Sequence, residues 1–216
     1  MIIVNFKAYR EIEGANALEM AKICRDVSVA SGITIAVCPP AAELGHVARN
    51  IDIPVLSQNA DPHTPGPSTG WMTPSMIKAA GAMGTLINHS EHKQSPIAEI
   101  VGFCKEHGLI TVVCADTSER AAEYASYRPD IIAVEPPELI GGDVSVTDAD
   151  PGVVEDTVNN VRSVSRGTSV LCGAGIKTGK DVARALELGA DGVLLASGVV
   201  RSKDPGASLA DLVRYL

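Results

Sequence analysis

A glutamate closes one of the most apolar segments of the chain. Residues 131–135 read IIAVE, and Pro136 and Pro137 follow directly. Proline cannot donate a hydrogen bond to a neighbouring strand, so a strand formed by this segment ends here. Because burying a charge is costly, Glu135 is either solvated at the strand end or held there for its chemistry. A carboxylate held in this way is a candidate general base.

Two other apolar segments also end in residues that could do chemistry. Residues 2–6 run through Asn5 into Lys7, and residues 84–88 run into His89. A cation, an imidazole and a carboxylate therefore follow three separate strands. Taken alone, Lys7 has a simpler explanation as a surface lysine and His89 as a packing histidine. We adopt that packing role for the remaining histidines, 46, 63, 92 and 107.

Two further segments end in small residues. Gly173-Ala174-Gly175 and Ala196-Ser197-Gly198 each open a turn into a helix. Small residues let backbone N–H groups approach an anion closely, and the start of a helix adds partial positive charge. These turns are a candidate phosphate site, although the glycines alone could simply serve the turns.

These residues need a framework that brings many strand ends to one rim. Short apolar runs alternate with helical patterns, which favours β/α units over β-hairpins. Eight nearly continuous apolar strands favour a closed (β/α)8 barrel with short helices, whose chemistry gathers at the carboxyl ends of the strands. A doubly wound open sheet is the alternative, but it usually carries a glycine-rich first turn, where this chain has Asn5-Phe6-Lys7. The expected strands are residues 2–6, 33–38, 53–57, 84–88, 109–114, 130–135, 169–173 and 191–196.

Several helices are predicted from their start and stop signals. Thr73-Pro74 begins one helix, and Gly81 ends it. Asp116 with Glu119 three residues later predicts a capping box before a helix at 117–127. Further helices fit residues 15–30, 41–50, a stretch from Pro96 toward Gly108, 151–164, 178–188 and 205–215.

Composition limits the class of protein. The 216 residues hold 18 basic and 26 acidic side chains, a formal charge of -8, and the basic residues are scattered, which argues against a nucleic-acid partner. No apolar run approaches the roughly 20 residues that a membrane span needs, and the N-terminus lacks the features of a signal peptide. We expect one cytoplasmic domain, residues 1–216, whose 5 cysteines are reduced and serve packing.

Seven short motifs span nearly the whole chain. They are VNFKAY, SQNAD at 57–61, STG at 68–70, INHSEHK at 87–93, AVEPPELIGG at 133–142, CGAGI at 172–176 and LLASGVV at 194–200. In kind and order this set resembles the triosephosphate isomerase family, in the short form typical of archaea. The longer form of the family has a tryptophan in the loop after the glutamate and a Gly-Gly-Ser turn after strand 7. This chain has Pro137-Glu138 and Gly-Ala-Gly there.

The resemblance implies a TIM-barrel enzyme that interconverts dihydroxyacetone phosphate and D-glyceraldehyde 3-phosphate through an enediolate. It also implies a place in glycolysis and gluconeogenesis, with no metal and no organic cofactor. In the family's mechanism Glu135 is the base, a neutral His89 polarises the carbonyl, and Lys7 offsets the charge of phosphate and oxyanion. The further substrate contacts implied are Asn5, Ile140, Gly141, Gly175, Ala196 and Ser197.

Two loops gain a role from the resemblance. Residues 136–142 have prolines at one end and glycines at the other, which fits a lid that excludes water. The segment 59–72 is rich in Pro and Gly yet holds Trp71 and Met72, which fits a docking loop. In the family this loop enters a neighbouring subunit, so a homo-oligomer is implied, either a dimer or a tetramer, with Thr69 approaching the neighbour's site.

Other functions stay open on the residues alone. A metal-dependent epimerase should show His and Asp ligands at several strand ends, where this chain has one His. A Schiff-base aldolase needs a buried lysine as its nucleophile. A catalytically silent phosphate-binding module is favoured if Glu135 or His89 is absent, and both are present.

Overall fold

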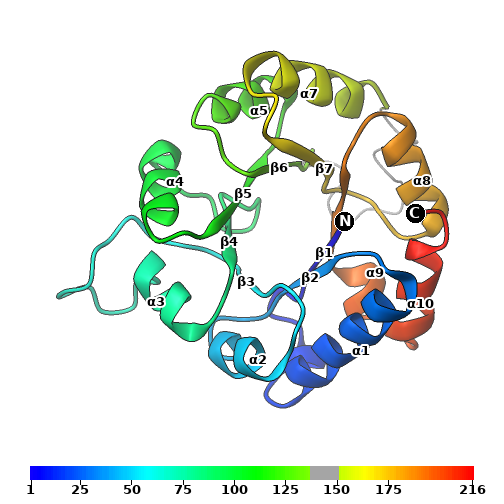
Figure 1. Ribbon diagram of the computed structural model, residues 1–216, viewed down its shortest axis with the longest axis horizontal. Helices are drawn as coiled ribbons and strands as arrows, with labels where there is room; N and C mark the ends of the chain where they lie inside the picture. Colours follow the sequence, from blue (N-terminus) through cyan, green and yellow to red (C-terminus); the bar gives the residue numbers. More distant parts are fainter. Residues whose placement is uncertain (137–150) are drawn as a thin grey trace.

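The chain folds into a (β/α)8 barrel. The computed structural model describes residues 1–136 and 151–216 (Figure 1). Eight parallel strands lie in the order β2-β1-β8-β7-β6-β5-β4-β3, and a parallel bridge between Val37 and Val55 joins the two ends of the sheet. The strands are β1 Ile2–Asn5, β2 Ile35–Cys38, β3 Leu56–Ser57, β4 Gly84–Ile87, β5 Ile110–Ala115, β6 Ile131–Val134, β7 Ser169–Cys172 and β8 Gly192–Leu195.

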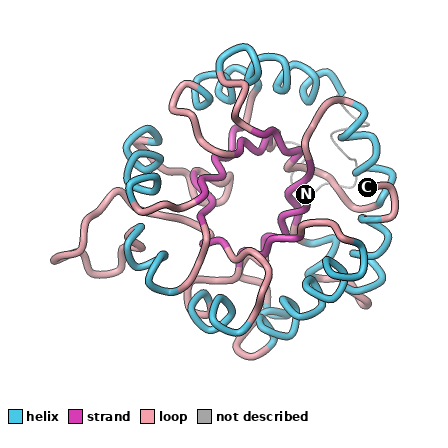
Figure 2. The backbone as a smooth tube through the Cα atoms, viewed as in Figure 1, coloured by secondary structure: helices cyan, strands magenta, loops and turns pink. Residues whose placement is uncertain are grey.

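Helices form an outer ring around the strands (Figure 2). In α4 the buried residues Ile97, Ile100, Val101 and Cys104 recur at helical spacing, so one face packs on the barrel. The described helices are α1 Asn16–Ser31, α2 Leu44–Asn50, α3 Pro74–Ala80, α4 Ile97–Glu106, α5 Ser118–Ala125, α7 Pro151–Val164, α8 Gly179–Glu187, α9 Ser197–Val200 and α10 Pro205–Val213, with a 3-10 helix η1 at Arg10–Ile12.

The two faces of each strand bury their side chains in different places. In β1, Ile3 belongs to the cluster inside the barrel, whereas Ile2 and Val4 belong to the cluster between strands and helices. Because strand side chains alternate, both faces must be apolar, which explains the continuous apolar runs. The inner cluster consists of Ile3, Ala36, Cys38, Leu56, Leu86, Val112, Cys114, Ile131, Ala133, Leu171 and Leu194.

The helix start signals were right in one case and wrong in another. Thr73 caps α3 through its hydroxyl, which accepts from the N–H of Met76. The capping box predicted at Asp116 and Glu119 is wrong, because Thr117 is the N-cap of α5 and accepts from Arg120. A complete capping box begins α8 instead, between Thr178 and Asp181.

One expected strand is much shorter than predicted. The apolar run 53–57 yields only β3, Leu56–Ser57. Pro54 has no N–H to donate, although its carbonyl accepts from Val37. The residues before β3 therefore contribute only an isolated bridge to the barrel wall.

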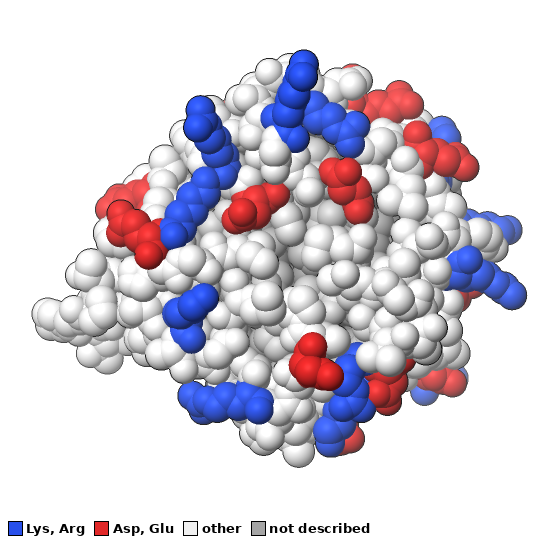
Figure 3. Space-filling model, in the orientation of Figure 1, with Lys and Arg blue, Asp and Glu red and all other residues white. Residues whose placement is uncertain are grey.

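The surface of the described residues carries mixed charge. Figure 3 shows basic and acidic side chains interspersed over one face, while the projecting end of the molecule is drawn in white. That projection is the segment between β3 and α3 (Figure 1). Within residues 1–136 and 151–216, no helix combines the length and apolar character needed to cross a membrane.

Gly84 tests how tightly the strands pack. A Cβ at this residue would lie 2.3 Å from the carbonyl oxygen of Ile110 on β5 and 2.8 Å from its Cβ. We predict that Gly84→Ala lowers the free energy of unfolding by about 1–3 kcal/mol, because the β4–β5 pairing must shift. Thermal or urea unfolding measures this change.

Gly102 provides the matched control. It lies within α4, and a Cβ there would meet no atom within 4 Å. Gly102→Ala should leave stability unchanged or raise it by up to about 1 kcal/mol, because alanine favours the helix. Equal destabilisation by both substitutions would contradict the packing argument.

Candidate active site

Glu135 occupies an inward-facing position at the carboxyl end of β6. It lies two residues after Ala133, which belongs to the inner cluster, and its N–H donates to the carbonyl of Ala115 at 2.7 Å. Its side chain is 3 % exposed. Gly173, at the end of the adjacent β7, leaves the room it needs, since a Cβ there would lie 2.7 Å from the Glu135 Cγ. The sequence predicted Gly173 as part of an anion-binding turn and missed this packing role.

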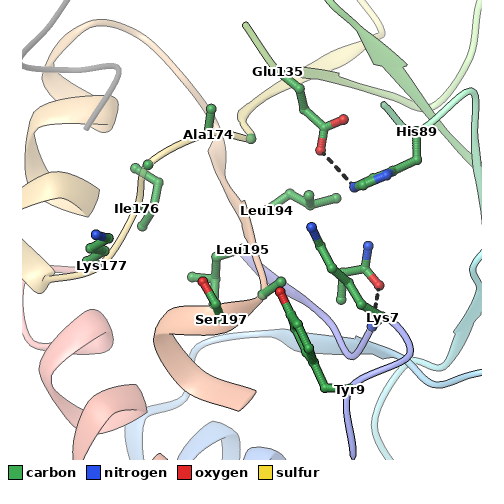
Figure 4. Close-up of a pocket in the computed structure, with 14 residues that line it drawn as sticks. Lys7, Tyr9, His89, Glu135, Ala174, Ile176, Lys177, Leu194, Leu195 and Ser197 are labelled. Carbon is green, nitrogen blue, oxygen red and sulfur yellow. Dashed lines mark hydrogen bonds and ion pairs between the residues drawn. The ribbon is translucent and has the colours of Figure 1, made fainter. Parts of the chain in front are cut away.

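His89 faces Glu135 across the top of the barrel. Its Nε2 lies 3.4 Å from Oε1 of Glu135, although the two residues follow β4 and β6 (Figure 4). The N–H of Glu91 donates to Nδ1 of His89 at 3.1 Å. Because Nδ1 accepts this bond, the neutral ring carries its proton on Nε2 and presents it to the site.

Asn5 ends β1, Lys7 follows it, and several hydrogen bonds hold both residues. Lys7 has a left-handed backbone, with φ 50, and its N–H donates to Oδ1 of Asn5 at 3.0 Å. The amide of Gln58 donates to Asn5 Oδ1 at 3.3 Å, to the carbonyl of Lys7 at 3.0 Å and to that of Cys38 at 3.0 Å. Nζ of Lys7 lies 2.6 Å from Oε1 of Glu91.

Burial shifts the pKa values of the two central residues in opposite directions. Desolvation raises the pKa of Glu135 to about 7, while Cys114, the Ser90 backbone and Lys7 favour its charged form. Desolvation also lowers the pKa of His89 to about 4, with a further contribution from the positive charge of Lys7. Near neutral pH the imidazole is therefore uncharged, and the carboxylate can both accept and return a proton.

A cleft of about 560 Å³ joins these side chains to the two small-residue turns. Gly175, Ala196 and Ser197 line it, together with Asn5, Lys7, His89 and Glu135. Tyr9 and Lys177 line it as well, and Figure 4 shows the Tyr9 ring pointing toward it. No local sequence pattern singles out these two residues or Gln58, because only the fold brings their loops to the rim.

Two of the predicted contacts cannot be placed. Ile140 and Gly141, and the rest of the expected lid beyond Pro136, lie outside the described residues. The remaining predicted site residues converge on one cleft from β1, β4, β6, β7 and β8.

Among the described residues, two buried polar atoms of the loops after β4 and β6 lack hydrogen-bond partners. Oε2 of Glu135 and Oγ of Ser90 make no hydrogen bond with the residues that the structure describes. Buried polar atoms are normally paired, and of these two residues only Glu135 lines the cleft, so its Oε2 is available to a ligand. In the same ranges no group of three His, Cys, Asp or Glu side chains is arranged to hold a metal ion.

Comparison with known proteins points to one family. The family profile described as Triosephosphate isomerase matches residues 1–216. A triosephosphate isomerase of Methanopyrus kandleri is 47% identical over 219 residues, covering 100% of this chain and 97% of the relative. One of Methanocaldococcus jannaschii is 45% identical over 218 residues, covering 100% of both chains. With a profile match over its full length and relatives of this identity, the chain belongs to the triosephosphate isomerase family.

Proposed function

We propose that this protein interconverts dihydroxyacetone phosphate and D-glyceraldehyde 3-phosphate through an enediolate. The observation that carries this proposal is the buried Oε2 of Glu135, which has no partner among residues 1–136 and 151–216. It lies beside a neutral His89, in a cleft that also contains small-residue turns suited to phosphate. The proposal includes a role in glycolysis and gluconeogenesis, a cytoplasmic location, and residues 1–216 acting as one catalytic domain.

Glu135 and His89 divide the proton chemistry. Glu135 removes the carbon-bound proton next to the carbonyl and returns it to the neighbouring carbon, for which a pKa of about 7 is well matched. His89 donates a hydrogen bond from Nε2–H to the carbonyl oxygen and shuttles protons between the two substrate oxygens. A neutral imidazole suits this role because its remaining proton is shared with the developing oxyanion.

Lys7 and the two small-residue turns stabilise the negative charge of the substrate. The Lys7 ammonium offsets the charge of phosphate and oxyanion, which matters in a chain of net charge -8. Asn5 donates to the substrate oxygens, and the backbone N–H groups of Gly175, Ala196 and Ser197 bind the phosphate. In the proposed closed state, Ile140 and Gly141 add further phosphate contacts.

A coupled assay tests the function directly. Purified protein is given glyceraldehyde 3-phosphate, and formation of dihydroxyacetone phosphate is followed with and without a chelator. We expect turnover that the chelator leaves unchanged. Loss of activity on chelation would favour a metal-dependent epimerase, and trapping of a substrate adduct by borohydride would favour a Schiff-base aldolase.

Glu135→Asp tests the base. The shorter side chain keeps the charge but withdraws the carboxylate, and a misplacement of about 1 Å can cost on the order of 100-fold in rate. We predict a loss of that size in kcat, with little change in KM, because substrate binding rests mainly on phosphate contacts. Steady-state kinetics and thermal unfolding of both proteins measure the two effects.

A surface glutamate gives the control for this variant. Glu106 ends α4 and is exposed, so Glu106→Asp makes the same chemical change away from the cleft. Its kcat should match that of the parent. Parental turnover in Glu135→Asp would show that Glu135 is not the base.

The raised pKa of Glu135 predicts how activity depends on pH. The base must be ionised, so kcat/KM should fall as the pH drops through about 7 and approach a tenfold loss per pH unit. A phosphate monoester ionises near pH 6, about one unit lower, and the two steps are separable. Carbon-13 NMR of the labelled Glu135 carboxyl gives a direct titration, and a midpoint near 4.5 would contradict the prediction.

A homo-oligomer, a dimer or a tetramer, forms a separate part of the proposal. The segment 59–72 projects from the barrel, and Trp71 on it is 48% exposed with its ring 4.4 Å from that of His63. The proposal places Thr69 of the partner subunit in an open hollow beside Lys7 and His89. Exposed aromatic surface of this kind is typical of a docking site.

Sedimentation measures the oligomeric state. We predict that the parent sediments as a dimer or larger species, and that Trp71→Ser shifts the population toward monomer because it removes exposed aromatic surface from the interface. Val29→Ser is the control, since Val29 is 74% exposed on α1, away from this segment. A fully active parental monomer at assay concentration would overturn this proposal.

A further inference from the structure

We infer that Asn88 and Gln94 form a positioning device, here called the Asn88–Gln94 clasp, that turns His89 into the cleft. The inference rests on the proposed function, because it concerns the orientation of the same imidazole. Neither residue lines the cleft, whereas both hold the loop that contains His89.

Strand alternation alone would point His89 the wrong way. Leu86 on β4 belongs to the cluster inside the barrel and Ile87 to the cluster facing the helices. Continued alternation would place the side chain of Asn88 inward and that of His89 outward. Instead Asn88 has φ 61, and His89 lies over the barrel with its Nε2 3.4 Å from Glu135. The left-handed residue redirects the chain just before the imidazole.

The clasp holds this backbone in place. The N–H of Asn88 donates to Oε1 of Gln94 at 2.9 Å, and the N–H of Gln94 donates to Oδ1 of Asn88 at 3.1 Å. These reciprocal bonds close residues 88–94 into a loop. Asparagine tolerates a positive φ better than most residues, and here its side chain also satisfies the loop it creates.

The clasp is tied to the strand that also positions Glu135. Nδ2 of Asn88, which is 4 % exposed, donates to the carbonyl of Cys114 at 3.0 Å and to the hydroxyl of Tyr124 at 3.4 Å. The next residue on β5, Ala115, accepts the N–H of Glu135 at 2.7 Å. Strand β5 thereby helps to position both Glu135 and the loop that contains His89.

A third anchor comes from the other side of the loop. Nε2 of Gln94 donates to the carbonyl of Ala60 at 2.6 Å, at the base of the projecting segment 59–72. Gln94 therefore links the loop after β4 to the loop after β3. Both side-chain amide nitrogens of the clasp therefore have an acceptor.

Two variants separate the amide groups from the left-handed backbone. Asn88→Gly keeps the positive φ but removes the whole side chain, and Gln94→Met removes the other half of the clasp from a partly exposed position. We expect kcat to fall roughly 10- to 100-fold in Asn88→Gly and by a smaller factor in Gln94→Met, with KM within about twofold of the parent.

The double variant gives the sharper readout. Because the two residues act through the same loop, Asn88→Gly with Gln94→Met should lose no more than Asn88→Gly alone. Nitrogen-15 NMR of His89 should show altered Nδ1 and Nε2 signals in all three variants. Asn50→Ala is the matched control, because its amide donates to the carbonyl of His46 within α2, away from the cleft, and it should keep the parental kcat.

Several results would overturn the inference. Parental kcat in Asn88→Gly, or multiplied losses in the double variant, would show that the clasp does not position His89. If Asn88→Gly fails to fold, Gln94→Met decides, and parental kcat with unchanged His89 signals in that variant would overturn the inference. Absence of isomerase activity in the parent would defeat the proposed function instead, and the His89 signals would still test the clasp.

Discussion

The closure of eight parallel strands into a barrel is the constraint on which the rest of the structure depends. Closure gives each strand an inner and an outer face, and the inner faces fill the barrel with side chains such as Ile3, Ala133 and Leu171. Two residues further along each strand, the next inward-facing position lies at the rim of the barrel. Asn5, Glu135 and Gly173 occupy these positions, each two residues beyond an inner residue. The same alternation that builds the core therefore also aims the site.

The chemistry of the rim depends on how little water reaches it. Glu135 is almost fully buried against apolar strands, which raises its pKa, and His89 is kept neutral by the same burial. One desolvated environment thus favours a carboxylate that can accept a proton and an imidazole that can donate a hydrogen bond. Burying Glu135 costs stability, and in the proposed function that cost serves reactivity.

Left-handed residues adjust the directions that the strands impose. Lys7 and Asn88 both have positive φ, and both stand at the junction between a strand and a loop of the site. Each is held by an amide side chain from outside its own strand, Gln58 in one case and Gln94 in the other. A positive φ is an unfavourable backbone conformation for these residues, and the neighbouring hydrogen bonds stabilise it. Such backbone strain is common at functional sites.

Much of this protein could be predicted from its sequence. The spacing of apolar runs predicted eight strands and a (β/α)8 barrel, and the polar residues that follow them predicted Lys7, His89 and Glu135 as neighbours, because both patterns are local along the chain. The short β3 and the false capping box at Asp116 show the limit of such local signals. Asp116 and Thr117 are both residue types that can cap a helix, and contacts in the folded chain decide that Thr117 does so.

Only the tertiary structure decided the contacts between distant loops. Gln58 reaches Lys7 across 51 residues of sequence, and Asn88 reaches Cys114 across 26. No pattern within either segment reveals these partners, because barrel closure brings them together. The same is true of Gly173, whose missing side chain matters only because Glu135 lies against it. Local sequence thus determined which residue types stand at each strand end, and closure decided which of them touch.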